Sequence, residues 1–427
     1  MNRAEFSLDQ WLSWMEQNHP VLIDLGLDRV RKVFESLSLD FTGIQLITVA
    51  GTNGKGTTLA YLDSIFQEAG YTTLCYTSPH LELYNERVRL CGTMVEDGVL
   101  VDAFQAIDRA RGEISLTYFE MGTLAALWIL DQYRPDVALL EVGLGGRLDA
   151  INVADADIAV VTTIDIDHIE WLGDDREQIG REKAGIFRAN APAVCGELLP
   201  PASIQAYADE LGTPLYQLNQ AFSYQKSDES WCWQGQTLAG NTRIIEDLPL
   251  PRLPLQNAAT ALQVIQLSGL SCDADAIKRG VANASVAGRM DTFTHKDRRF
   301  ILDVAHNPQS AQYLAAHLSQ EQGPVQLILG MLADKDCQQV MVSLSSVVDQ
   351  WHLVTLDVPR GQTAEALKGR LPQEVESHQV FCYGSVEKAI SCLLDDTPQG
   401  ENSGVIVVAG SFFTVGAAYR ALNREIK

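Results

Sequence analysis

A glycine-rich loop that carries one lysine is the feature of this sequence most suited to chemistry. Residues 51–58 read Gly-Thr-Asn-Gly-Lys-Gly-Thr-Thr and lie between an apolar run at 46–50 and an amphipathic run at 59–69. Backbone N–H groups of such a turn can close on phosphate oxygens, and the N-terminus of a following helix adds about half a positive charge. Lys55 would reach the terminal phosphates, and the hydroxyl of Thr57 or Thr58 would offer an oxygen ligand to Mg²⁺. The sequence therefore predicts a site for a nucleoside triphosphate, with contacts from Thr52, Asn53, Gly54, Lys55, Gly56 and Thr57.

The spacing of this loop departs from the general phosphate-loop pattern. Gly51 and Gly54 give Gly-x-x-Gly-Lys, whereas the common form is Gly-x-x-x-x-Gly-Lys. An ordinary glycine turn is the alternative, but strand, loop, lysine, hydroxyl and helix follow one another in the order that phosphate binding requires. We therefore expect a variant of the loop.

Two further residues are predicted to lie at the same edge of a sheet. Glu141 ends the apolar run 137–142, and His168 follows the apolar run 158–164 by a few residues. The carboxyl ends of parallel strands are where α/β sheets place their ligands, and a carboxylate there can bind Mg²⁺. A lone histidine is more often structural, and by its chemistry alone His168 would suggest zinc or a general base.

The runs that position these residues predict an α/β fold. Apolar, β-branched runs at 46–50, 137–142 and 158–164 alternate with helical patterns, which is typical of a mostly parallel sheet. A second series follows at 300–305, 326–330, 352–356 and 405–409, and residues 222–233 between the two series predict an antiparallel excursion. The polar segment 291–299 is the expected hinge. We therefore predict a P-loop ATPase-type, mostly parallel sheet domain over residues 1–292 and a smaller, Rossmann-like C-terminal α/β domain over residues 293–427.

Composition excludes several classes of protein. The chain has 427 residues, is 46% hydrophobic and 20% charged, and carries a formal charge of -23, which is typical of a globular protein and unfavourable for binding nucleic acid or an anionic membrane. Its eight cysteines are scattered without zinc-ligand spacing, so we expect free thiols. The first residues lack the pattern of a signal peptide, so we expect a cytoplasmic protein.

Further motifs lie along nearly the whole chain, at residues 76–81, 116–120, 141–150, 167–168, 171–173, 181–186 and 302–308. Together with the variant loop at 50–57, they resemble the Mur ligase superfamily and within it the folate branch of folylpolyglutamate and dihydrofolate synthases. This resemblance implies an ATP-dependent ligase that joins glutamate to a pterin acid through an acyl phosphate, and it implies a monomer.

The resemblance assigns roles around the loop. It makes Ser78, Glu141 and His168 ligands of two Mg²⁺ ions, in addition to Thr57. It also makes Lys183 a lysine carbamoylated by CO₂, although a lysine in such an amphipathic segment is by default a solvated surface charge. Carbamoylation requires a neutral amine, which burial and a nearby positive charge can supply by lowering the lysine pKa.

The same resemblance gives roles to residues beyond the loop. Asn257 and Arg289 match positions that contact ATP, although Asn257 fits equally well as the N-cap of the next helix. A guanidinium such as Arg289, near the domain junction, can neutralise charge on the transferring phosphoryl group when the domains close. Asp303 matches a nucleotide contact and His306 a catalytic residue near the incoming amino acid, and both end a predicted strand. Lys55, Lys183 and His306 are thus the expected catalytic residues.

Two substrates are implied, and three segments would bind them. Glutamate would be added to dihydropteroate, forming dihydrofolate, and to the γ-carboxyl group of reduced folates. Aromatic Tyr118 or Phe119 could stack on the pterin ring, although core packing is the alternative for both. Ile151 replaces the threonine that the family commonly has there. The segments are Ile23, Asp24 and Leu25; Thr117, Tyr118, Phe119 and Glu120; and Leu148, Asp149 and Ala150.

Three alternatives stay open at this point. One is a folylpolyglutamate synthase with a single activity, and another is a peptidoglycan-precursor Mur ligase. The latter generally carries a UDP-binding N-terminal domain, for which the stretch before residue 46 is too short. The third is a P-loop switch or motor ATPase, which would need an aspartate where the strand ends in Glu141.

Overall fold

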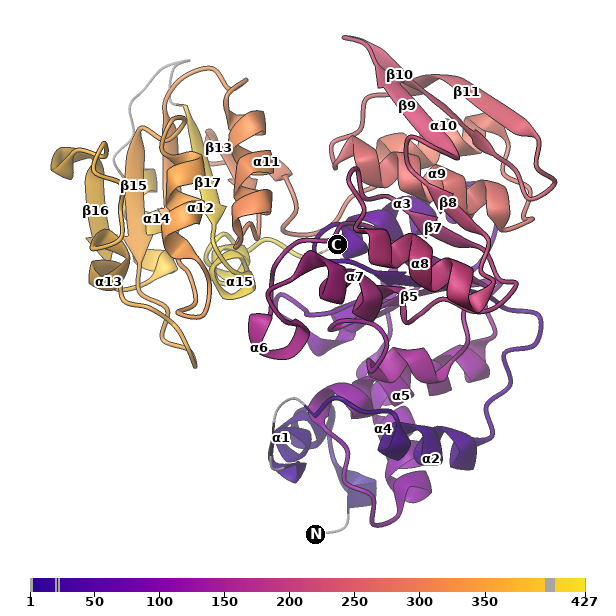
Figure 1. The fold of residues 1–427 in the computed structure, drawn as a ribbon. Helices are drawn as coiled ribbons and strands as arrows, with labels where there is room; N and C mark the ends of the chain where they lie inside the picture. Colours follow the sequence, from indigo (N-terminus) through magenta and orange to yellow (C-terminus); the bar gives the residue numbers. More distant parts are fainter. Residues whose placement is uncertain (1–2, 20, 22–23, 396–403, 427) are drawn as a thin grey trace. The chain divides into compact units, whose positions relative to one another are not determined.

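The computed structural model describes residues 3–19, 21, 24–395 and 404–426, so Ile23, an expected substrate contact, lies outside the described residues. The chain divides into two compact units, Met1–Ala284 and Ser285–Lys427. The predicted α/β fold is confirmed in both: each unit in Figure 1 contains a sheet with helices packed on it.

The boundary between the units lies before the expected one. The segment 291–299, expected as a hinge, forms an antiparallel hairpin in unit 2, and a boundary at 292/293 would cut its first strand. The strand alternates half-buried and exposed residues because it is the outermost strand of its sheet, which gives it the polar composition of a linker. The hairpin strands are β12 (Asp291–His295) and β13 (Arg298–Leu302).

Unit 1 is built on an eight-stranded sheet in its described part, in the order β4-β3-β2-β5-β1-β6-β7-β8. Parallel pairing runs from β2 to β8, whereas β3 and β4 are antiparallel. The predicted strands at 46–50, 137–142 and 158–164 are β1, β5 and β6, side by side at the centre. The bounds are β1 Gln45–Ala50, β2 Thr73–Tyr76, β3 Val88–Leu90, β4 Thr93–Met94, β5 Val137–Glu141, β6 Ile158–Val161, β7 Ala193–Cys195 and β8 Leu215–Gln217.

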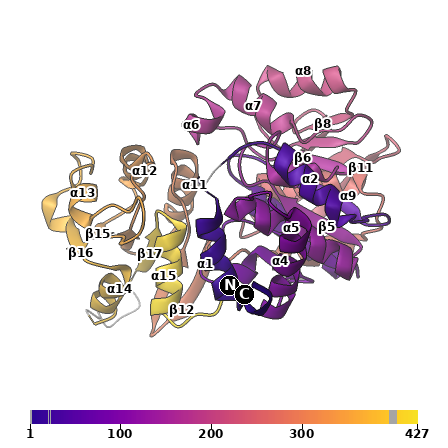
Figure 2. The ribbon, with the colours of Figure 1, turned by 90° about the horizontal axis from the view of Figure 1, so that it is seen from below.

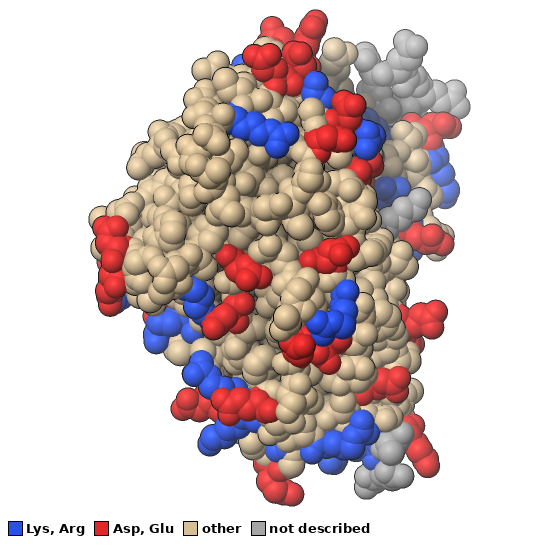
Figure 3. Space-filling model, turned by 90° about the vertical axis from the view of Figure 1, so that its right-hand side faces the viewer, with Lys and Arg blue, Asp and Glu red and all other residues tan. Residues whose placement is uncertain are grey.

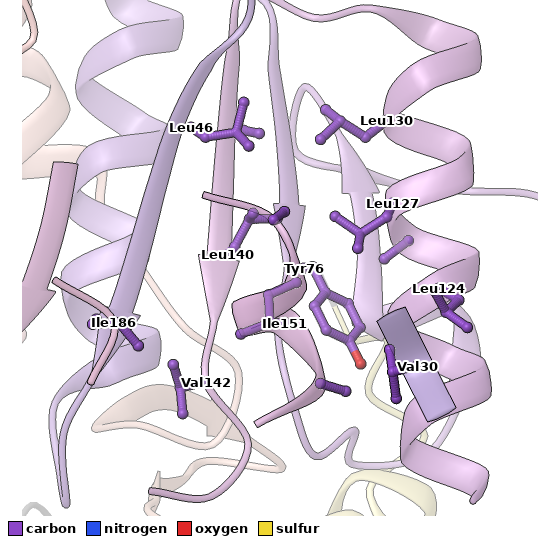
Figure 4. Packing of buried hydrophobic residues seen from close by; sticks show 14 of the residues in the cluster. Val30, Leu46, Tyr76, Leu124, Leu127, Leu130, Leu140, Val142, Ile151 and Ile186 are labelled. Atoms are coloured by element: carbon purple, nitrogen blue, oxygen red, sulfur yellow. The ribbon is translucent and has the colours of Figure 1, made fainter. Parts of the chain in front are cut away.

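The alternation of side chains along β5 decides which way Glu141 points. Ala138 and Leu140 belong to the core that includes Leu124, Leu127 and Leu130, as Figure 4 shows for Leu140 and the three leucines. Because successive strand residues face opposite sides of a sheet, Glu141 faces the other side, where α3 packs on β5. The sheet therefore aims this carboxylate at the helix that follows the glycine-rich loop.

Helices cover both faces of this sheet. Helices α1, α2, α4 and α5 pack together (Figure 2), and their buried apolar residues belong to the same core cluster as Leu140. Helix α3 packs instead against α9 and α10. The α-helices are α1 Leu8–Asn18, α2 Asp28–Leu37, α3 Lys55–Glu68, α4 Asp97–Arg111, α5 Tyr118–Tyr133, α6 Ile169–Leu172, α7 Arg176–Ala184, α8 Ala202–Leu211, α9 Leu255–Leu267 and α10 Ala274–Asn283, and the 3₁₀ helices are η1 Arg3–Glu5, η2 Tyr84–Arg87 and η3 Ala150–Val153.

The predicted antiparallel excursion is a three-stranded sheet of unit 1. Its strands β9 (Phe222–Lys226), β10 (Ser230–Gln236) and β11 (Thr242–Pro249) follow one another along the chain and lie in the order β11-β10-β9. Buried Trp233 joins this sheet to α9, because its indole N–H donates to the carbonyl of Ala259 at 3.0 Å.

Unit 2 is a second, smaller α/β layer structure. Its described part holds a six-stranded sheet in the order β12-β13-β17-β14-β15-β16, in which every pair but β12–β13 is parallel. Besides the hairpin it contains β14 Val325–Leu329, β15 Gln350–Val354, β16 Val380–Tyr383, β17 Val405–Ala409, α11 Pro308–Leu318, α12 Cys337–Leu344, α13 Ala364–Lys368, η4 Ser377–Gln379, α14 Val386–Asp395 and α15 Phe412–Ala421.

The surface agrees with the charge expected from the sequence. On the face shown in Figure 3, acidic and basic side chains are interspersed, with no broad basic patch. Within the described ranges, no helix has both the length and the apolar character that crossing a membrane requires. All eight cysteines are free, as expected.

The close approach of α10 to α3 generates a stability prediction. A Cβ at Gly280 of α10 would lie 2.6 Å from the Cα atom of Ile65 in α3, which is too short for any side chain. We expect Gly280→Ala to lower the free energy of unfolding of unit 1 by about 1–3 kcal/mol. Urea unfolding followed by tryptophan fluorescence measures this, because every tryptophan except Trp351 lies in unit 1.

Gly98 in α4 is the matched control, because a Cβ there meets nothing within 4 Å. Gly98→Ala should leave the stability unchanged or raise it by up to about 1 kcal/mol. Equal effects of the two substitutions would contradict the packing described for α10 and α3.

Candidate active site

The glycine-rich loop is a tight turn that requires glycine at two positions. One position has no space for a side chain, and the other has a left-handed backbone conformation. A Cβ at Gly51 would lie 1.9 Å from the hydroxyl oxygen of Thr162. Gly54 has a φ of 84° and is the N-cap of α3, which begins at Lys55. A left-handed backbone favours glycine, and an α-helix leaves its first N–H groups without acceptors of its own. The turn therefore presents the N-terminus of α3 as the predicted phosphate site requires.

Residues that follow β6 hold the loop in place. The backbone N–H of Thr52 donates to the carbonyl of Thr163 at 2.8 Å, and that of Asn53 donates to the hydroxyl of Thr163 at 3.0 Å. The hydroxyl of Thr162 donates in turn to the carbonyl of Asn53 at 2.6 Å. The backbone N–H groups of Thr52 and Asn53, two predicted nucleotide contacts, therefore fix the loop. The donors suited to binding phosphate oxygens are the first N–H groups of α3.

Three polar side chains converge on the start of α3. The Nζ atom of Lys55 donates to the carbonyl of Gly51 at 3.0 Å. Thr57 donates to the carbonyl of Gly54 at 3.0 Å and accepts from the side-chain amide of Asn257 at 2.5 Å. Asn257 therefore reaches the loop from α9, 200 residues away in sequence. Its interpretation as a helix N-cap is wrong, because Pro254 is the N-cap of α9.

Glu141 lies beside this helix start. It is 6% exposed, and its Oε2 atom would be 4.0 Å from a Cβ built on Gly56. The same oxygen accepts the backbone N–H of Ser78 at 3.0 Å. The carboxylate of Glu141 therefore lies against the backbone of Ser78 and beside the first turn of α3, which carries Thr57. Three of the predicted metal ligands belong to this one region.

His168 occupies a more exposed position. It is the N-cap of α6 with a φ of 53°, its side chain is 47% exposed, and Nε2 lies 3.9 Å from an oxygen of Asp167. No three His, Cys, Asp or Glu side chains converge as a metal cluster in the described part of the chain. The predicted magnesium ligands include only two residues of these types, Glu141 and His168, and the others are hydroxyl groups.

Lys183 is a buried amine on α7. It is 3% exposed. Burial, and after it the positive charge of Lys55, lower the pKa of Lys183 to about 7, against an opposing effect of Asp167. The default interpretation of a solvated surface lysine is therefore wrong, and the residue meets the requirement for a neutral amine near physiological pH.

Arg29 joins two of the predicted substrate segments. Its guanidinium donates to Glu120 at 2.8 Å and meets a carboxylate oxygen of Asp24 at 2.5 Å. Glu120 also caps α5, because it accepts the backbone N–H of Thr117 at 2.7 Å while the hydroxyl of Thr117 accepts the N–H of Glu120 at 3.1 Å. Sequence reasoning missed Arg29, whose one signal is a basic residue in the first turn of a helix, where acidic residues are usual.

The two aromatic residues of the second segment differ in their surroundings. Both are half-buried. The ring of Phe119 lies against the backbone of Gly143, where a Cβ would be 2.4 Å from Cζ. Tyr118 packs edge-on to Tyr84 with a centroid distance of 5.7 Å, and burial raises its pKa. Part of each ring thus packs within unit 1, and the half-buried remainder is compatible with ligand contact.

Asp149 holds the turn between β5 and η3. Its two carboxylate oxygens accept the backbone N–H groups of Leu144 at 2.8 Å and Ile151 at 3.0 Å. Burial raises the pKa of Asp149 to about 6, although these hydrogen bonds and Lys55 oppose that shift. Leu148 is half-buried and Ala150 is buried. Asp149 therefore has a structural role in the turn, and its electrostatic interaction with Lys55 places it near the loop.

Unit 2 carries its own group of predicted residues. Asp303 accepts the backbone N–H groups of Met290 at 2.9 Å and Ala305 at 2.8 Å, and burial raises its pKa while the charge of Arg289 opposes this. Nδ1 of His306 lies 2.9 Å from the carbonyl of Val304. Because a carbonyl only accepts, Nδ1 carries the proton, and the neutral ring has its basic nitrogen at Nε2. Arg289 and His306 both lie against the ring of Phe412, at 5.5 and 6.3 Å.

Comparison with known families and proteins gives a consistent result. Residues 49–196 match the Mur ligase middle domain, and residues 288–412 match the Mur ligase, glutamate ligase domain. Along the whole chain, the sequence is 44% identical over 423 residues to a dihydrofolate synthase/folylpolyglutamate synthase of Escherichia coli, covering 99% of this chain and 97% of that protein.

Two solved structures show the same similarity in three dimensions. The chain superimposes on E. coli FolC in complex with DHPP and ADP with a TM-score of 0.92 at 43% identity, covering 99% of each chain. It superimposes on a bifunctional folylpolyglutamate synthase/dihydrofolate synthase with Mn, AMPPNP and L-glutamate bound with a TM-score of 0.89 at 42% identity, covering 98% of this chain and 99% of the other.

The lowered pKa of Lys183 makes a prediction about stability and pH. Between about pH 7 and the ordinary value of 10.5, the unfolded chain holds a proton at this lysine that the folded chain lacks. The free energy of unfolding therefore gains a contribution that rises with pH across this window. Lys183→Met should be more stable than the native chain near pH 7, and the difference should shrink towards pH 10.5.

Urea unfolding at several pH values in CO₂-depleted buffer measures this difference. Lys226→Met is the control, because Lys226 is exposed, and it should show no trend. A Lys183→Met difference that stays constant with pH would show that this lysine titrates normally.

Proposed function

The chain belongs to the dihydrofolate synthase/folylpolyglutamate synthase family of the Mur ligases, and from this premise we propose that it is an ATP-dependent ligase that adds L-glutamate to dihydropteroate and to the γ-carboxyl group of reduced folates. The full-length similarity to bifunctional relatives carries this proposal. The chemistry gathered at the edge of the unit 1 sheet supports it independently. We also propose, from the resemblance, that it acts as a monomer in the cytoplasm.

The reaction needs an activated acid. A carboxylate does not condense with an amine near neutral pH, because oxide would have to leave. Transfer of the γ-phosphoryl group of ATP to a carboxylate oxygen releases ADP and forms an acyl phosphate. The α-amine of glutamate then attacks the acyl carbon, phosphate leaves with that oxygen, and the nitrogen loses a proton. The protein has to position three substrates and keep water from the acyl phosphate.

The start of α3 would hold the nucleotide. The donors that open the helix would bind phosphate oxygens, and Lys55 would turn from the carbonyl of Gly51 to the terminal phosphates. Asn257 would keep Thr57 in place through their 2.5 Å hydrogen bond. The loop is already fixed by Thr162 and Thr163, so nucleotide binding needs little reordering of the backbone.

The residues at this sheet edge fit a hard cation. Glu141 is a buried carboxylate that accepts the backbone N–H of Ser78, a residue with a hydroxyl side chain, and lies beside the first turn of α3, which carries Thr57. Carboxylate and hydroxyl oxygens are the ligands that Mg²⁺ prefers. We propose Thr57, Ser78, Glu141 and His168 as the residues that hold Mg²⁺. When bound, Mg²⁺ would neutralise phosphate charge during phosphoryl transfer.

We further propose that Lys183 is carbamoylated. Two observations support this: the amine is 3% exposed, and its pKa is lowered to about 7, so a substantial fraction is the neutral nucleophile that reacts with CO₂. The carbamate would give residue 183 a negative charge, whereas the positive charge of Lys55 disfavours a protonated amine at that position. That exchange removes the repulsion that lowers the lysine pKa.

In unit 2, we propose that Asp303 and Arg289 contact the nucleotide and that His306 serves the incoming glutamate. The tautomer of His306, fixed by the carbonyl of Val304, gives Nε2 the lone pair that can take a proton from an amine. Asp303 fixes the backbone at Met290 and Ala305, so its role in the structure includes shaping this corner of unit 2.

The pterin segments would provide the binding site for the acid. Half-buried Tyr118 and Phe119 offer ring faces for stacking, and the Arg29 pair with Asp24 and Glu120 ties two of the segments together. We propose that these residues, with Leu25, Thr117, Leu148, Asp149 and Ala150, contact the pterin acid.

A product assay tests the proposed function. Purified protein with ATP, Mg²⁺ and L-glutamate should convert dihydropteroate to dihydrofolate in one reaction and lengthen a reduced folate monoglutamate in another, as seen by mass spectrometry. Glu141→Gln should lower kcat by roughly a hundredfold or more in both, because it removes the charge at the metal site while keeping the shape. Glu229→Gln, at an exposed position, is the control. Phosphate release from ATP without an acid and glutamate would favour an ATPase instead.

Intact mass and ¹³C NMR with ¹³C-bicarbonate test the carbamate. The native protein should show one added carboxyl group and one carbamate signal, and both should be missing in Lys183→Met but present in Lys226→Met. An unmodified Lys183 in the active, bicarbonate-supplied enzyme would remove this part of the proposal.

A further inference from the structure

Arg87 is a buried cation at the end of η2. The residue is 8% exposed. Its guanidinium lies over the ring of Tyr84 at 5.3 Å and over the ring of Tyr118 at 5.6 Å. Aromatic faces attract a cation, but they do not saturate the five N–H donors of a guanidinium. The partners of these donors therefore decide what this arginine does.

One donor of Arg87 has a partner in the described structure. Its Nε–H donates to Nδ1 of His80 at 2.9 Å. Among the described residues, no carboxylate oxygen lies within 4.0 Å of a guanidinium nitrogen of Arg87, so no ion pair forms. Its terminal Nη1 and Nη2 atoms are not fully buried. Burying an unpaired charge is costly, and proteins normally pair such an arginine.

The neighbouring acid does not balance this charge. Glu86 precedes Arg87 and is 6% exposed, but its carboxylate accepts the backbone N–H groups of Leu81, Glu82 and Leu83 at 2.6–2.8 Å. Its role is to fix the turn before η2. Arg87 thus differs from Arg29 and Arg111 in the same unit, which pair with Glu120 and Asp108 at 2.8 and 2.7 Å.

The position of Arg87 connects it to the proposed substrate site. Tyr118, on which it stacks, belongs to the pterin segment at 117–120, and the charge of Arg87 is also felt by Tyr76, which packs against Phe119 with a centroid distance of 6.4 Å. The backbone carbonyl of Arg87 accepts the N–H of Thr77, next to Ser78. The guanidinium therefore lies among the aromatic rings near the Ser78 end of β2.

We propose that Arg87 binds a carboxylate of the pterin acid. This carboxylate pairs with the guanidinium, which has no ion-pair partner among the described residues. The inference rests on the proposed function, since it names the group that positions that substrate. A guanidinium with two accessible terminal nitrogens matches a carboxylate in the bidentate geometry that arginine favours. Arg87 is a positioning residue for the acid.

Two carboxylates share this chemistry. One is the group that both dihydropteroate and folate present for phosphorylation, and the other is the α-carboxylate that only a folate carries. In the first case both activities depend on Arg87. In the second case, only the addition of glutamate to folate depends on Arg87, and the addition of glutamate to dihydropteroate does not.

Steady-state kinetics of Arg87→Met and Arg87→Lys test this proposal, with dihydropteroate in one arm and a reduced folate monoglutamate in the other. We expect KM for at least one acid to rise by roughly 10- to 100-fold in Arg87→Met, while KM for ATP and glutamate stays within about twofold. Arg87→Lys should recover part of the loss, because it restores the charge without the two-pronged geometry. A rise in both arms assigns the phosphorylated carboxylate, and a rise for folate alone assigns the α-carboxylate.

Arg111→Met is the matched control. Arg111 is equally buried, at 8% exposed, and stacks on Trp14 at 5.1 Å, but it pairs with Asp108. We expect it to change stability without a selective rise in KM for the acids. Native KM values for both acids in Arg87→Met, or an equal change in every KM as in Arg111→Met, would overturn the proposal.

A second measurement keeps the proposal testable if Arg87→Met does not fold. Arg87→Lys retains the charge, and its binding of dihydropteroate is compared with that of the carboxamide analogue, which lacks the negative charge. The native chain should prefer the acid by roughly tenfold or more, and the preference should shrink in Arg87→Lys. An undiminished preference would contradict the proposal. If the native chain forms product but these variants behave as native, only this inference fails; if the native chain forms no product, the proposed function fails.

Discussion

Buried charge beside the carboxyl ends of the central strands is the constraint on which the rest of unit 1 depends. Glu141, Asp149 and Lys183 are each less than one-tenth exposed, and Lys55 influences the last two. Burial raises the pKa of Asp149 and lowers that of Lys183, so in both residues it destabilises the charged form. A bound polyphosphate with its metal would compensate such charges.

Close packing around glycines keeps this edge in place. Gly51 fits under Thr162, Gly54 beside Asn257, and Gly143 against the ring of Phe119, each at a distance that leaves no space for a side chain. These contacts join the glycine-rich loop to the residues after β6 and to α9, and they join the turn after β5 to the start of α5. The rigid loop reduces the ordering cost of binding.

Much of the fold could be predicted from the sequence because the central strands are short, apolar and bounded by turns. β1, β5 and β6 appear where their patterns indicated, and so does the loop before α3. The unit boundary was predicted at 292/293 and lies at 284/285, because β12 is an edge strand and an exposed edge strand has the polar composition of a linker. The sequence also left open whether Asn257 caps a helix, because the residue type that caps a helix can equally make a long-range hydrogen bond, here to Thr57.

For the site, the sequence pattern found the residues that adjoin strands and missed those defined by tertiary contacts. Arg29 has only the weak signal of a basic residue in the first turn of a helix, and Arg87 has no local signal, because pairing with Glu120 and stacking on Tyr118 depend on the packing of η2, α2 and α5. The burial of Lys183 is likewise a product of how α7 packs, whereas its amphipathic neighbours suggested a surface residue. The roles of Asp303 and His306 rest on the resemblance, to which the structure adds their hydrogen bonds.

The most direct test of the account is a crystal structure of the protein with a non-hydrolysable ATP analogue and Mn²⁺, using anomalous scattering to locate the metal. The account predicts the triphosphate on the first turn of α3, at Lys55 and Thr57, with a manganese ion bound by the carboxylate of Glu141. A triphosphate elsewhere, or an ion that does not contact Glu141, would contradict it.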